Sequence, residues 1–322
     1  MLKNYLLSAW RSLRRDKVTS VVNLSGLCVG MTSAVLILLW VRNELNFDDY
    51  YTNARNIYRL TSKMSDNSYT WENTSYPVGS VIKREIPEVS DVVRCAIYSP
   101  IINLNGTLVY QQKCAFVDGN WFDFFHYDLV DGDLAAFKAS PGSLVLSASE
   151  AQKYFGDKRA VGELLKIDST IYRVEAVVAD PPANSSIQFG TLLSMRARQA
   201  GPDRRDDTLQ WGSDGYVTFV KTIEQADKNV VEQKVNSVIK GNLKDILITL
   251  VGLQEMHFES DLRVSEFDHS DKTSVYVFAI LAMLLLFVAC VNYVNLTTAR
   301  ASLYAREVRL TKFTHEIGRA HV

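Results

Sequence analysis

Two long runs of uncharged residues lie near the two ends of the chain. The first has 24 residues, from Val18 to Val41, and the second has 27, from Thr273 to Ala299. A helix of 24 residues rises about 36 Å, which is enough to cross a hydrocarbon core of roughly 30 Å. Two such runs would be unusual as core helices of a soluble domain this small. The pattern therefore predicts two transmembrane helices.

The first run also follows a basic segment, as the apolar region of a signal peptide does. Its apolar stretch is long for a signal peptide, and Leu38–Arg42 offers no small-residue cleavage site. We interpret the run as an uncleaved anchor.

The positive charges predict how the chain is oriented in the membrane. Residues 1–17 carry a net charge of +4 and residues 300–322 a net charge of +3, whereas residues 46–274 hold 24 basic and 32 acidic side chains. Basic flanks close to membrane spans stay in the cytoplasm. Both termini are therefore expected inside, with the region between the spans outside. The net charge of the whole chain is −1, which gives no case for nucleic-acid binding.

The segment before the first run has a helical apolar period. One stripe carries Leu2, Tyr5, Leu6, Ala9, Trp10 and Leu13, and the basic side chains lie mostly off it. An apolar face with a basic remainder is typical of a helix lying among lipid headgroups, although an ordinary cytoplasmic flank is the alternative. The candidate interfacial or partner-facing residues are Leu2, Tyr5, Leu6, Trp10, Arg11, Arg14 and Arg15.

The region between the spans has the pattern of a mixed α and β (α+β) domain. Its candidate strands are rich in Val, Ile, Tyr and Phe and are bounded by turn residues. They are Ile57–Met64, Val92–Tyr98, Leu108–Val117, Ser143–Leu146, Ile171–Val178 and Tyr216–Lys221.

Helix and loop signals separate these strands. The capping box Ser147–Glu150 precedes a helix over Ala151–Phe155, and an apolar stripe runs through Asp227–Lys240. The double proline in Asp180–Asn184 predicts an irregular loop. Residues 199–215 are polar and mostly unpatterned, which indicates a loop or a subdomain junction. The order and pairing of the strands do not follow from these patterns.

The sequence carries no recognised catalytic motif. It has no GxxxxGK[ST], no GxSxG and no HExxH, and its five histidines are scattered. A metal site from His257, Glu259, Asp261 and His269 is imaginable, but polar residues close to a membrane are far more often solvated. We therefore expect a protein that is not an enzyme, with no catalytic residue, no cofactor and no metal.

Two pairs of residues remain as candidates for specific contacts. Cys95 and Cys114 lie in candidate strands of the outside domain, where a disulfide is permitted; two separate buried thiols are the alternative. Asn292 and Asn295 lie near the inner end of the second run. Amides there would be costly facing lipid, so we expect them to face other helices or the headgroup level.

Short motifs along residues 1 to about 313 occur in an order and spacing that resemble one family. In chain order they are Lys3-Asn4-Tyr5, Ala9–Arg15, Glu44–Asp48, Ile57–Leu60, Val117-Asp118, Phe122–Phe125, Gly132-Asp133, Leu146-Ser147, Tyr154–Gly156, Val161-Gly162, Asp180–Ser185, Asn292–Leu296, Thr298–Ala301 and Arg306–Val308. Together they resemble the MacB/FtsX-like ABC transporter permeases, especially those common in Bacteroidetes. One departure is Arg309, which stands where the family usually has glycine.

The resemblance implies a division of the chain. The expected parts are a cytoplasmic amphipathic helix (1–17), a first span (18–41), a MacB-like periplasmic core domain (46–272), a second span (273–299) and the start of a cytoplasmic FtsX-like segment (300–314). Residues 315–322 look like a translated sequencing adapter, so the chain is interpreted as the N-terminal fragment of a longer permease.

The resemblance also implies a function. A separate cytoplasmic ATPase would hydrolyse ATP, and the permease would carry the motion to its periplasmic domain for export or mechanotransmission. The implied location is the bacterial inner membrane. The implied partners are the ATPase, the lipid bilayer, a second permease and, in some members, a periplasmic adaptor or outer-membrane duct. The transported substrate and the identity of the ATPase do not follow from it.

A two-span sensor with an extracytoplasmic ligand-binding domain is the rival interpretation. Chemoreceptors and sensor kinases share the layout of two spans around an outside domain. A sensor would continue from the second span into a heptad-rich signalling helix pair, and residues 300–314 are too few to test this. The resemblance of the core domain favours the permease.

Overall fold

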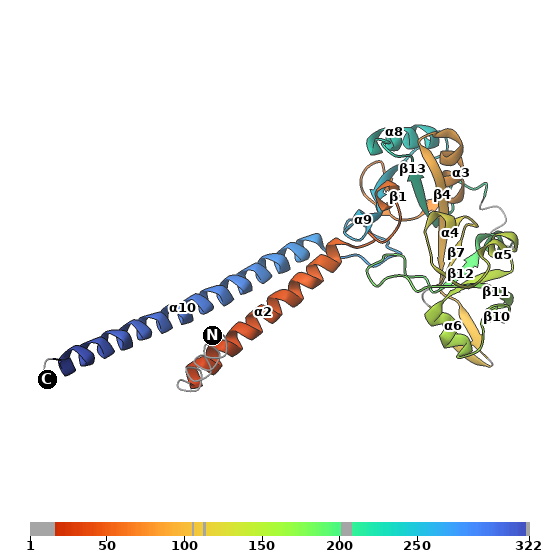
Figure 1. The fold of residues 1–322 in the computed structure, drawn as a ribbon. Helices are drawn as coiled ribbons and strands as arrows, with labels where there is room; N and C mark the ends of the chain where they lie inside the picture. Colours follow the sequence, from red (N-terminus) through yellow and green to blue (C-terminus); the bar gives the residue numbers. More distant parts are fainter. Residues whose placement is uncertain (1–16, 105, 112–113, 201–207, 320–322) are drawn as a thin grey trace. The chain divides into compact units, whose positions relative to one another are not determined.

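The structure is a computed structural model that describes residues 17–104, 106–111, 114–200 and 208–319. It divides into two compact units (Figure 1). One contains the long helices α2 (Lys17–Leu45) and α10 (Lys272–Arg319), and the other is the domain Asn46–Asp271. The predicted interfacial residues Leu2 to Arg15 lie outside the described residues.

The helices α2 and α10 are both long and apolar enough to cross a membrane. Their candidate spans are Leu24–Leu45 and Lys272–Asn295, and only 11% and 17% of the apolar windows are buried. Core helices of a soluble protein would be mostly buried, so these helices have the exposure expected of membrane spans.

The two helices pack against each other in antiparallel fashion. Trp40 meets Phe278 edge to face, with ring centroids 5.2 Å apart. Further along the pair, a side chain at Gly30 would lie 3.5 Å from Ala289 Cβ. Small residues at this contact let the two backbones come close, as is common between helices in membranes.

The domain is built on one extended sheet. Its central path has the order β14-β1-β13-β4-β7-β12-β9-β11-β10-β5-β6, and three short strands, β2, β3 and β8, pair beside it. The strands are β1 (Ile57–Met64), β2 (Thr70–Trp71), β3 (Thr74–Ser75), β4 (Val89–Tyr98), β5 (Ile101–Leu104), β6 (Thr107–Tyr110), β7 (Cys114–Val117), β8 (Leu129–Gly132), β9 (Ser143–Ser147), β10 (Leu164–Ile167), β11 (Thr170–Val178), β12 (Thr191–Ser194), β13 (Asp214–Thr222) and β14 (Ile246–Gly252).

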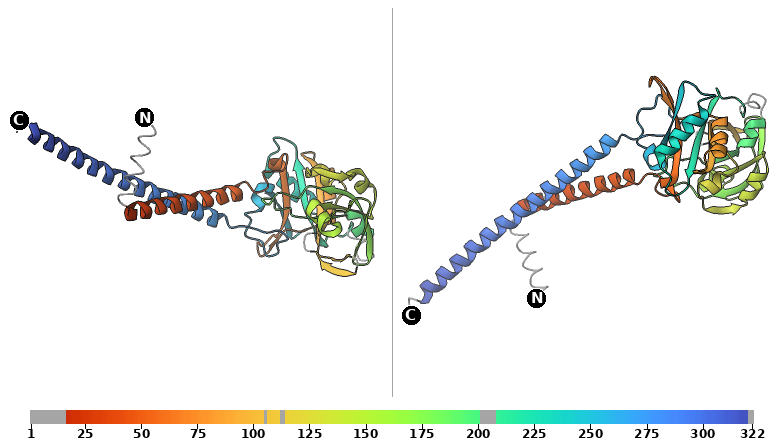
Figure 2. Two further views of the ribbon diagram at one scale, coloured as in Figure 1. Left: turned by 60° about the horizontal axis from the view of Figure 1, so that its bottom comes forward. Right: turned by 90° about the horizontal axis from the view of Figure 1, so that it is seen from above.

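Four strands and two helices at one end of the sheet form a β-α-β-β-α-β unit. The chain runs β1, α3 (Tyr76–Glu85), β4 and later β13, α8 (Lys228–Ile239), β14, and the antiparallel strand order is β14-β1-β13-β4. This is the split β-α-β arrangement of ferredoxin-like folds. Helices α3 and α8 lie side by side over one face of it (Figure 2).

The rest of the domain is a long insertion between β4 and β13. It contributes β5 to β12, including the parallel pairs β7–β12 and β9–β11. Its helices are α4 (Trp121–Phe124), α5 (Leu134–Ala139), α6 (Ala148–Phe155) and α7 (Met195–Ala200). Two further short helices, η1 (Ala54–Asn56) and α9 (Leu253–Met256), flank the β-α-β-β-α-β unit at its two chain ends.

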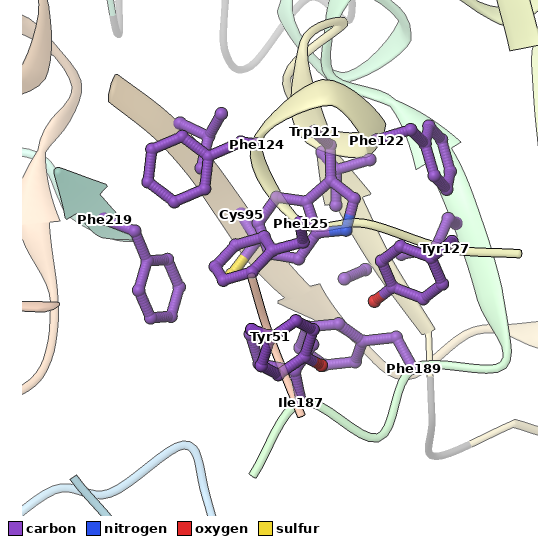
Figure 3. Close-up of a cluster of buried hydrophobic side chains, with 14 of the residues drawn as sticks. Tyr51, Cys95, Trp121, Phe122, Phe124, Phe125, Tyr127, Ile187, Phe189 and Phe219 are labelled. Carbon is purple, nitrogen blue, oxygen red and sulfur yellow. The ribbon is translucent and has the colours of Figure 1, made fainter. Parts of the chain in front are cut away.

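An aromatic cluster covers the face of the sheet opposite α3 and α8 (Figure 3). Trp121 and Phe125, both fully buried, lie at its centre with ring centroids 4.7 Å apart. Phe219 from β13 packs edge to face on Phe125 at 5.2 Å. The cluster joins the insertion to the β-α-β-β-α-β unit because its side chains come from both.

Most of the predicted elements are confirmed. The strand Ile57–Met64 is β1 residue for residue. The helix predicted over Ala151–Phe155 is α6, which begins three residues earlier at Ala148. There Ser147 Oγ accepts the Glu150 N–H, and Gly156 ends the helix at φ 59°. The helix predicted in Asp227–Lys240 is α8 between its two caps, and the prolines at 181 and 182 lie in an irregular loop.

Two details differ from the prediction. The single strand expected over Leu108–Val117 is wrong, because the chain forms β6, leaves the sheet edge near Gln111 and enters the sheet centre as β7. The stretch 199–215, expected as a loop or a subdomain junction, is shorter than predicted, because residues 199–200 belong to α7 and residues 214–215 to β13.

Candidate functional site at the two ends of the domain

Two segments carry the chain into and out of the domain, and both are built into its core. We call Asn46–Asn56 the entry segment and residues 253–271 the exit segment. Tyr51 and Ala54 of the entry segment and Leu253 and Met256 of the exit segment belong to the aromatic cluster, and Phe267 packs against it. Movement of either segment therefore disturbs the packing of the core.

A buried carboxylate ties the entry segment to the insertion. Asp48 is fully buried, and its Oδ1 accepts the Ser186 N–H at 2.8 Å and the Ser185 hydroxyl at 3.1 Å. Its Oδ2 accepts the Ser186 hydroxyl at 2.5 Å, and the hydroxyls of Tyr51 and Ser185 lie 2.9 Å apart. Burial raises the pKa of Asp48, and the hydrogen bonds from Ser186 and Ser185 oppose that rise. We call Asp48, Tyr51, Ser185 and Ser186 the entry cluster.

The entry and exit segments also contact each other. The rings of Phe47 and His257 are stacked, with centroids 3.6 Å apart and planes 6° from parallel. Beside them, the Gln254 side-chain amide donates to Asp49 Oδ1 at 2.6 Å. The two connections to the spans are therefore fastened to one another within the domain.

A second polar cluster holds the exit segment to β1 and to the turn after β2. The guanidinium of Arg59, which is fully buried on β1, pairs with Glu72 and Glu259. Glu72, also fully buried, accepts the Glu266 N–H at 2.5 Å and lies 2.8 Å from His269 Nε2. We call Arg59, Glu72, Glu259 and His269 the exit cluster.

The electrostatics of the exit cluster depend on complete pairing. Burial raises the pKa of Glu259, and the positive charge of Arg59 opposes that rise. Removing one partner of a buried ion pair leaves an uncompensated charge, which costs about 3–5 kcal/mol. The intact cluster contributes little net free energy, but separating its charges costs much. This cost keeps the exit segment in one position.

Three of the four residues considered for a metal site make other contacts. His257 stacks on Phe47, Glu259 pairs with Arg59, and His269 contacts Glu72. Within the part of the chain that the structure describes, no three His, Cys, Asp or Glu side chains form a group that could hold a metal ion. The arrangement is suited to fixing two segments of chain in place.

An open pocket of about 500 Å³ lies beside the exit segment. Burial raises the pKa of its one carboxylate, Asp214, and a hydrogen bond from Trp71 opposes the rise. The lining residues are Met64, Ser68, Tyr69, Trp71, Asn73, Asp214 and Val264. An apolar lining with few polar groups is typical of binding sites and has no pair of groups arranged for acid–base chemistry.

The two cysteines of the domain are not bonded to each other. Their strands β4 and β7 are antiparallel neighbours, but Cys95 lies opposite Val117 and Cys114 opposite Tyr98. Tyr98, the residue opposite Cys114, lies three positions after Cys95 in β4, and side chains three positions apart in a strand point to opposite faces of the sheet. The two thiols therefore belong to different core clusters. Burial raises the pKa of both thiols. The alternative of two separate buried thiols is the one found.

Of the two asparagines near the end of the second span, one faces the other helix. A side chain at Gly26 would lie 3.6 Å from Asn292 Nδ2, so Asn292 points to α2 and is half-buried, whereas Asn295 is exposed. An interhelical polar contact of Asn292 or Asn295 stays a prediction.

Sequence reasoning missed the exit cluster. Arg59 and Glu72 are separated by only 13 positions, but Glu259 and His269 come from the far end of the domain. The available signal was an arginine inside the otherwise apolar strand Ile57–Leu60, because a charge at such a position needs a buried partner.

Comparison with protein families gives a match over most of the chain. Residues 20–238 match the model of the MacB-like periplasmic core domain. The chain belongs to the MacB-like ABC transporter permeases. This agrees with the resemblance found in the sequence and favours the permease over a two-span sensor.

One solved structure shows the fold of the MacB-like domain, and two others resemble it more weakly. A domain of a "putative Permease protein" from Porphyromonas gingivalis is 18% identical with a TM-score of 0.55, and the match covers 67% of this chain and 95% of that one. The periplasmic region of MacB from Actinobacillus actinomycetemcomitans is 16% identical, with a TM-score of 0.47 and coverage of 61% and 89%. The extracellular domain of the noncanonic ABC-type transporter YknZ from Gram-positive bacteria is 13% identical, with a TM-score of 0.47 and coverage of 60% and 100%. No curated protein matches the chain.

Proposed function

We propose that the chain is the non-catalytic permease subunit of an ABC transporter, which carries motion driven by a separate cytoplasmic ATPase to its periplasmic domain. The observation that carries this proposal is the way in which the domain holds its two connections to the spans. Both are packed into the aromatic cluster and secured by the entry and exit clusters. A displacement of either connection would therefore move the core of the domain with it.

The proposed orientation places both termini in the cytoplasm and the domain in the periplasm of the inner membrane. Its support is the basic charge on both outer flanks and the acidic balance of the region between the spans. Asp157, which is exposed in the turn after α6, offers a test. In intact spheroplasts, a membrane-impermeant maleimide should label an Asp157→Cys variant whose Cys28 and Cys290 are replaced by alanine. Labelling only after lysis would contradict this orientation.

The proposed partners are a cytoplasmic ABC ATPase and a second permease, with a periplasmic adaptor or outer-membrane duct in export systems. The absence of a GxxxxGK[ST] motif in the sequence is consistent with ATP hydrolysis by another subunit. The basic segment before the first span and the basic segment after the second span are proposed to face that ATPase.

The proposal is tested by asking whether ATP moves the domain. The full-length permease and the ABC ATPase encoded nearest to it would be reconstituted in nanodiscs, with a spin label at Asp157→Cys in the same cysteine-replaced background. ATP should change the distance between the two labels of a dimer. Asp48→Ala should reduce that change while ATP hydrolysis continues, and Leu209→Ala, at a position that is 78% exposed, should leave it intact. No ATP-dependent change in the parent protein would refute the coupling role.

A further inference from the structure

His269 lies between two hydrogen-bond acceptors. Its Nδ1 is 2.8 Å from the carbonyl oxygen of Met256, and its Nε2 is 2.8 Å from Oε1 of Glu72. A carbonyl oxygen can only accept, so the hydrogen on Nδ1 belongs to the ring. In the neutral ring Nε2 would then carry a lone pair, which would face an oxygen of Glu72 that also carries lone pairs.

A second proton at this contact resolves the conflict. Glu72 is fully buried, and it receives the Arg59 guanidinium on Oε1 and the Glu266 N–H on Oε2. Both interactions stabilise the ionised carboxylate. The proton therefore belongs on Nε2, and the ring is an imidazolium that donates from both nitrogens.

The charges around the ring agree with this assignment. Arg59 on β1 and the imidazolium balance Glu72, which follows β2, and Glu259, which follows α9. Asp261 and Glu266 add negative charge on the exit segment, and Asp268 precedes the ring in the chain. With a neutral ring, the buried part of the cluster would carry an excess negative charge, which is costly at low dielectric.

We propose that His269 and Glu72 form a proton-binding site that fastens the exit segment to the domain, so that loss of the proton releases this segment. The bound ligand is a single proton, held between Nε2 and Oε1. When it leaves, the contact between the exit segment and Glu72 becomes a repulsion between lone pairs, and the chain leading to the second span loses one of its attachments. Loss of a proton is favoured as the pH rises, so the attachment weakens when the outer side of the membrane becomes more alkaline.

Hydrogen exchange on the full chain in detergent micelles tests the release. Exchange of peptides covering residues 257–271, corrected for the intrinsic effect of pH, would be compared at pH 6 and pH 8.5. We expect roughly 10- to 100-fold faster exchange at the higher pH, which is equivalent to losing one charge-assisted hydrogen bond. His269→Gln should remove this dependence. His126→Gln, at a histidine whose side chain is 68% exposed beside Asp128, should keep it.

A spectroscopic measurement tests the protonation state in the parent chain, and a variant serves only to assign the signal. Imidazole ¹⁵N chemical shifts of the ¹⁵N-histidine-labelled full chain distinguish the imidazolium from the neutral tautomers. The signal that is missing in His269→Gln identifies this ring, and in the parent chain at pH 6 that ring should be an imidazolium. A neutral His269 ring at pH 6, or equal exchange of residues 257–271 at both pH values, would overturn the proposal.

Discussion

Phe47 and His257 stack face to face, with ring centroids 3.6 Å apart. One ring belongs to the segment that follows the first span and the other to the segment that leads to the second. Each ring therefore fixes the position of the other, and the two segments cannot separate without breaking the contact.

We expect this stack to contribute a measurable coupling energy. Aromatic pairs that are offset or edge to face are worth about 0.5–1.5 kcal/mol beyond the area that they bury, and we expect a coupling no larger than that here. Thermal unfolding of Phe47→Ala, His257→Ala and the double variant in detergent gives the coupling as a double-mutant cycle. Strictly additive effects of the two substitutions would show that the rings do not interact.

Glu72→Gln should destabilise the domain strongly. It leaves Arg59 with only one carboxylate in a fully buried position, and the expected loss is about 3–5 kcal/mol. Glu259→Gln should cost less because the Glu259 side chain is 19% exposed and water can replace part of the pairing. Chemical denaturation monitored by tryptophan fluorescence would measure both.

Glu85→Gln is the matched control for these two variants. Glu85 pairs with Arg84 on the surface, where its side chain is 48% exposed. The loss should remain within about 0.5 kcal/mol. A cost for Glu72→Gln no greater than that for Glu85→Gln would contradict the structural role of the exit cluster.

The stability contribution of Asp48 should depend on pH in the direction opposite to that of a typical surface carboxylate. Because burial raises the pKa of Asp48 in the folded state, the folded protein takes up this proton before the unfolded chain does. The contribution is fully present below the unfolded pKa of about 3.9 and is lost as the pH rises through the raised folded value.

Asp48→Asn isolates this effect because asparagine does not titrate. The melting temperature of the parent protein minus that of Asp48→Asn, both in the same detergent, should increase as the pH falls from 7 towards 4. A difference that is constant over this range, or that decreases on acidification, would mean that the Asp48 carboxylate is not in the buried setting described.

Alanine substitutions at two glycines distinguish the cost of a left-handed backbone from the cost of a steric clash. Gly106 and Gly132 have φ values of +93° and +90°. A Cβ at Gly106 would meet nothing within 4 Å, whereas one at Gly132 would lie 2.2 Å from the backbone oxygen of Glu175. Gly106→Ala should cost about 1–2 kcal/mol for the left-handed conformation alone.

Gly132→Ala should cost about 1–3 kcal/mol more, since it also forces β8 away from β11. Equal melting temperatures of the two alanine variants would show that the pairing of these strands is looser than the structure has it. Hydrogen exchange of residues 170–178 would show whether the extra loss arises in this pair.

The sequence predicted an element well where the residues that define its ends are adjacent to it in the chain. Strand β1 was predicted without error because its β-branched and aromatic residues lie between clear breakers, and α6 because its cap and its terminal glycine are adjacent in the chain. The stretch Leu108–Val117 misled because both of its halves are strands. Only tertiary structure sends one half to the sheet edge and the other to its centre.

The site was beyond local patterns for the same reason. Glu72 meets His269 across 197 positions, and Asp48 meets Ser186 across 138. The sequence showed a resemblance around Glu44–Asp48 and Ile57–Leu60, and the arginine within Ile57–Leu60 indicated that a buried partner exists, but nothing local identified that partner. The sheet order explains why Glu72 and His269 lie so far apart in the sequence. The insertion after β4 separates the two halves of the β-α-β-β-α-β unit along the chain, although the two halves are neighbours in space.

The pairing of β1 with β14 decides how the domain would respond to being pulled. The ladder is antiparallel, and its first pair, Tyr58 with Gly252, lies where the chain enters β1 and leaves β14. Forces that draw the two connections apart would therefore peel the ladder open one pair at a time, whereas forces that move them together would leave it closed. Phe47 precedes Tyr58 and His257 follows Gly252 in the chain, so the Phe47–His257 stack joins the two connections before a force reaches the first pair of the ladder. The domain should therefore resist forces that move both connections together, and forces that pull the connections apart should open the ladder first at Tyr58 and Gly252.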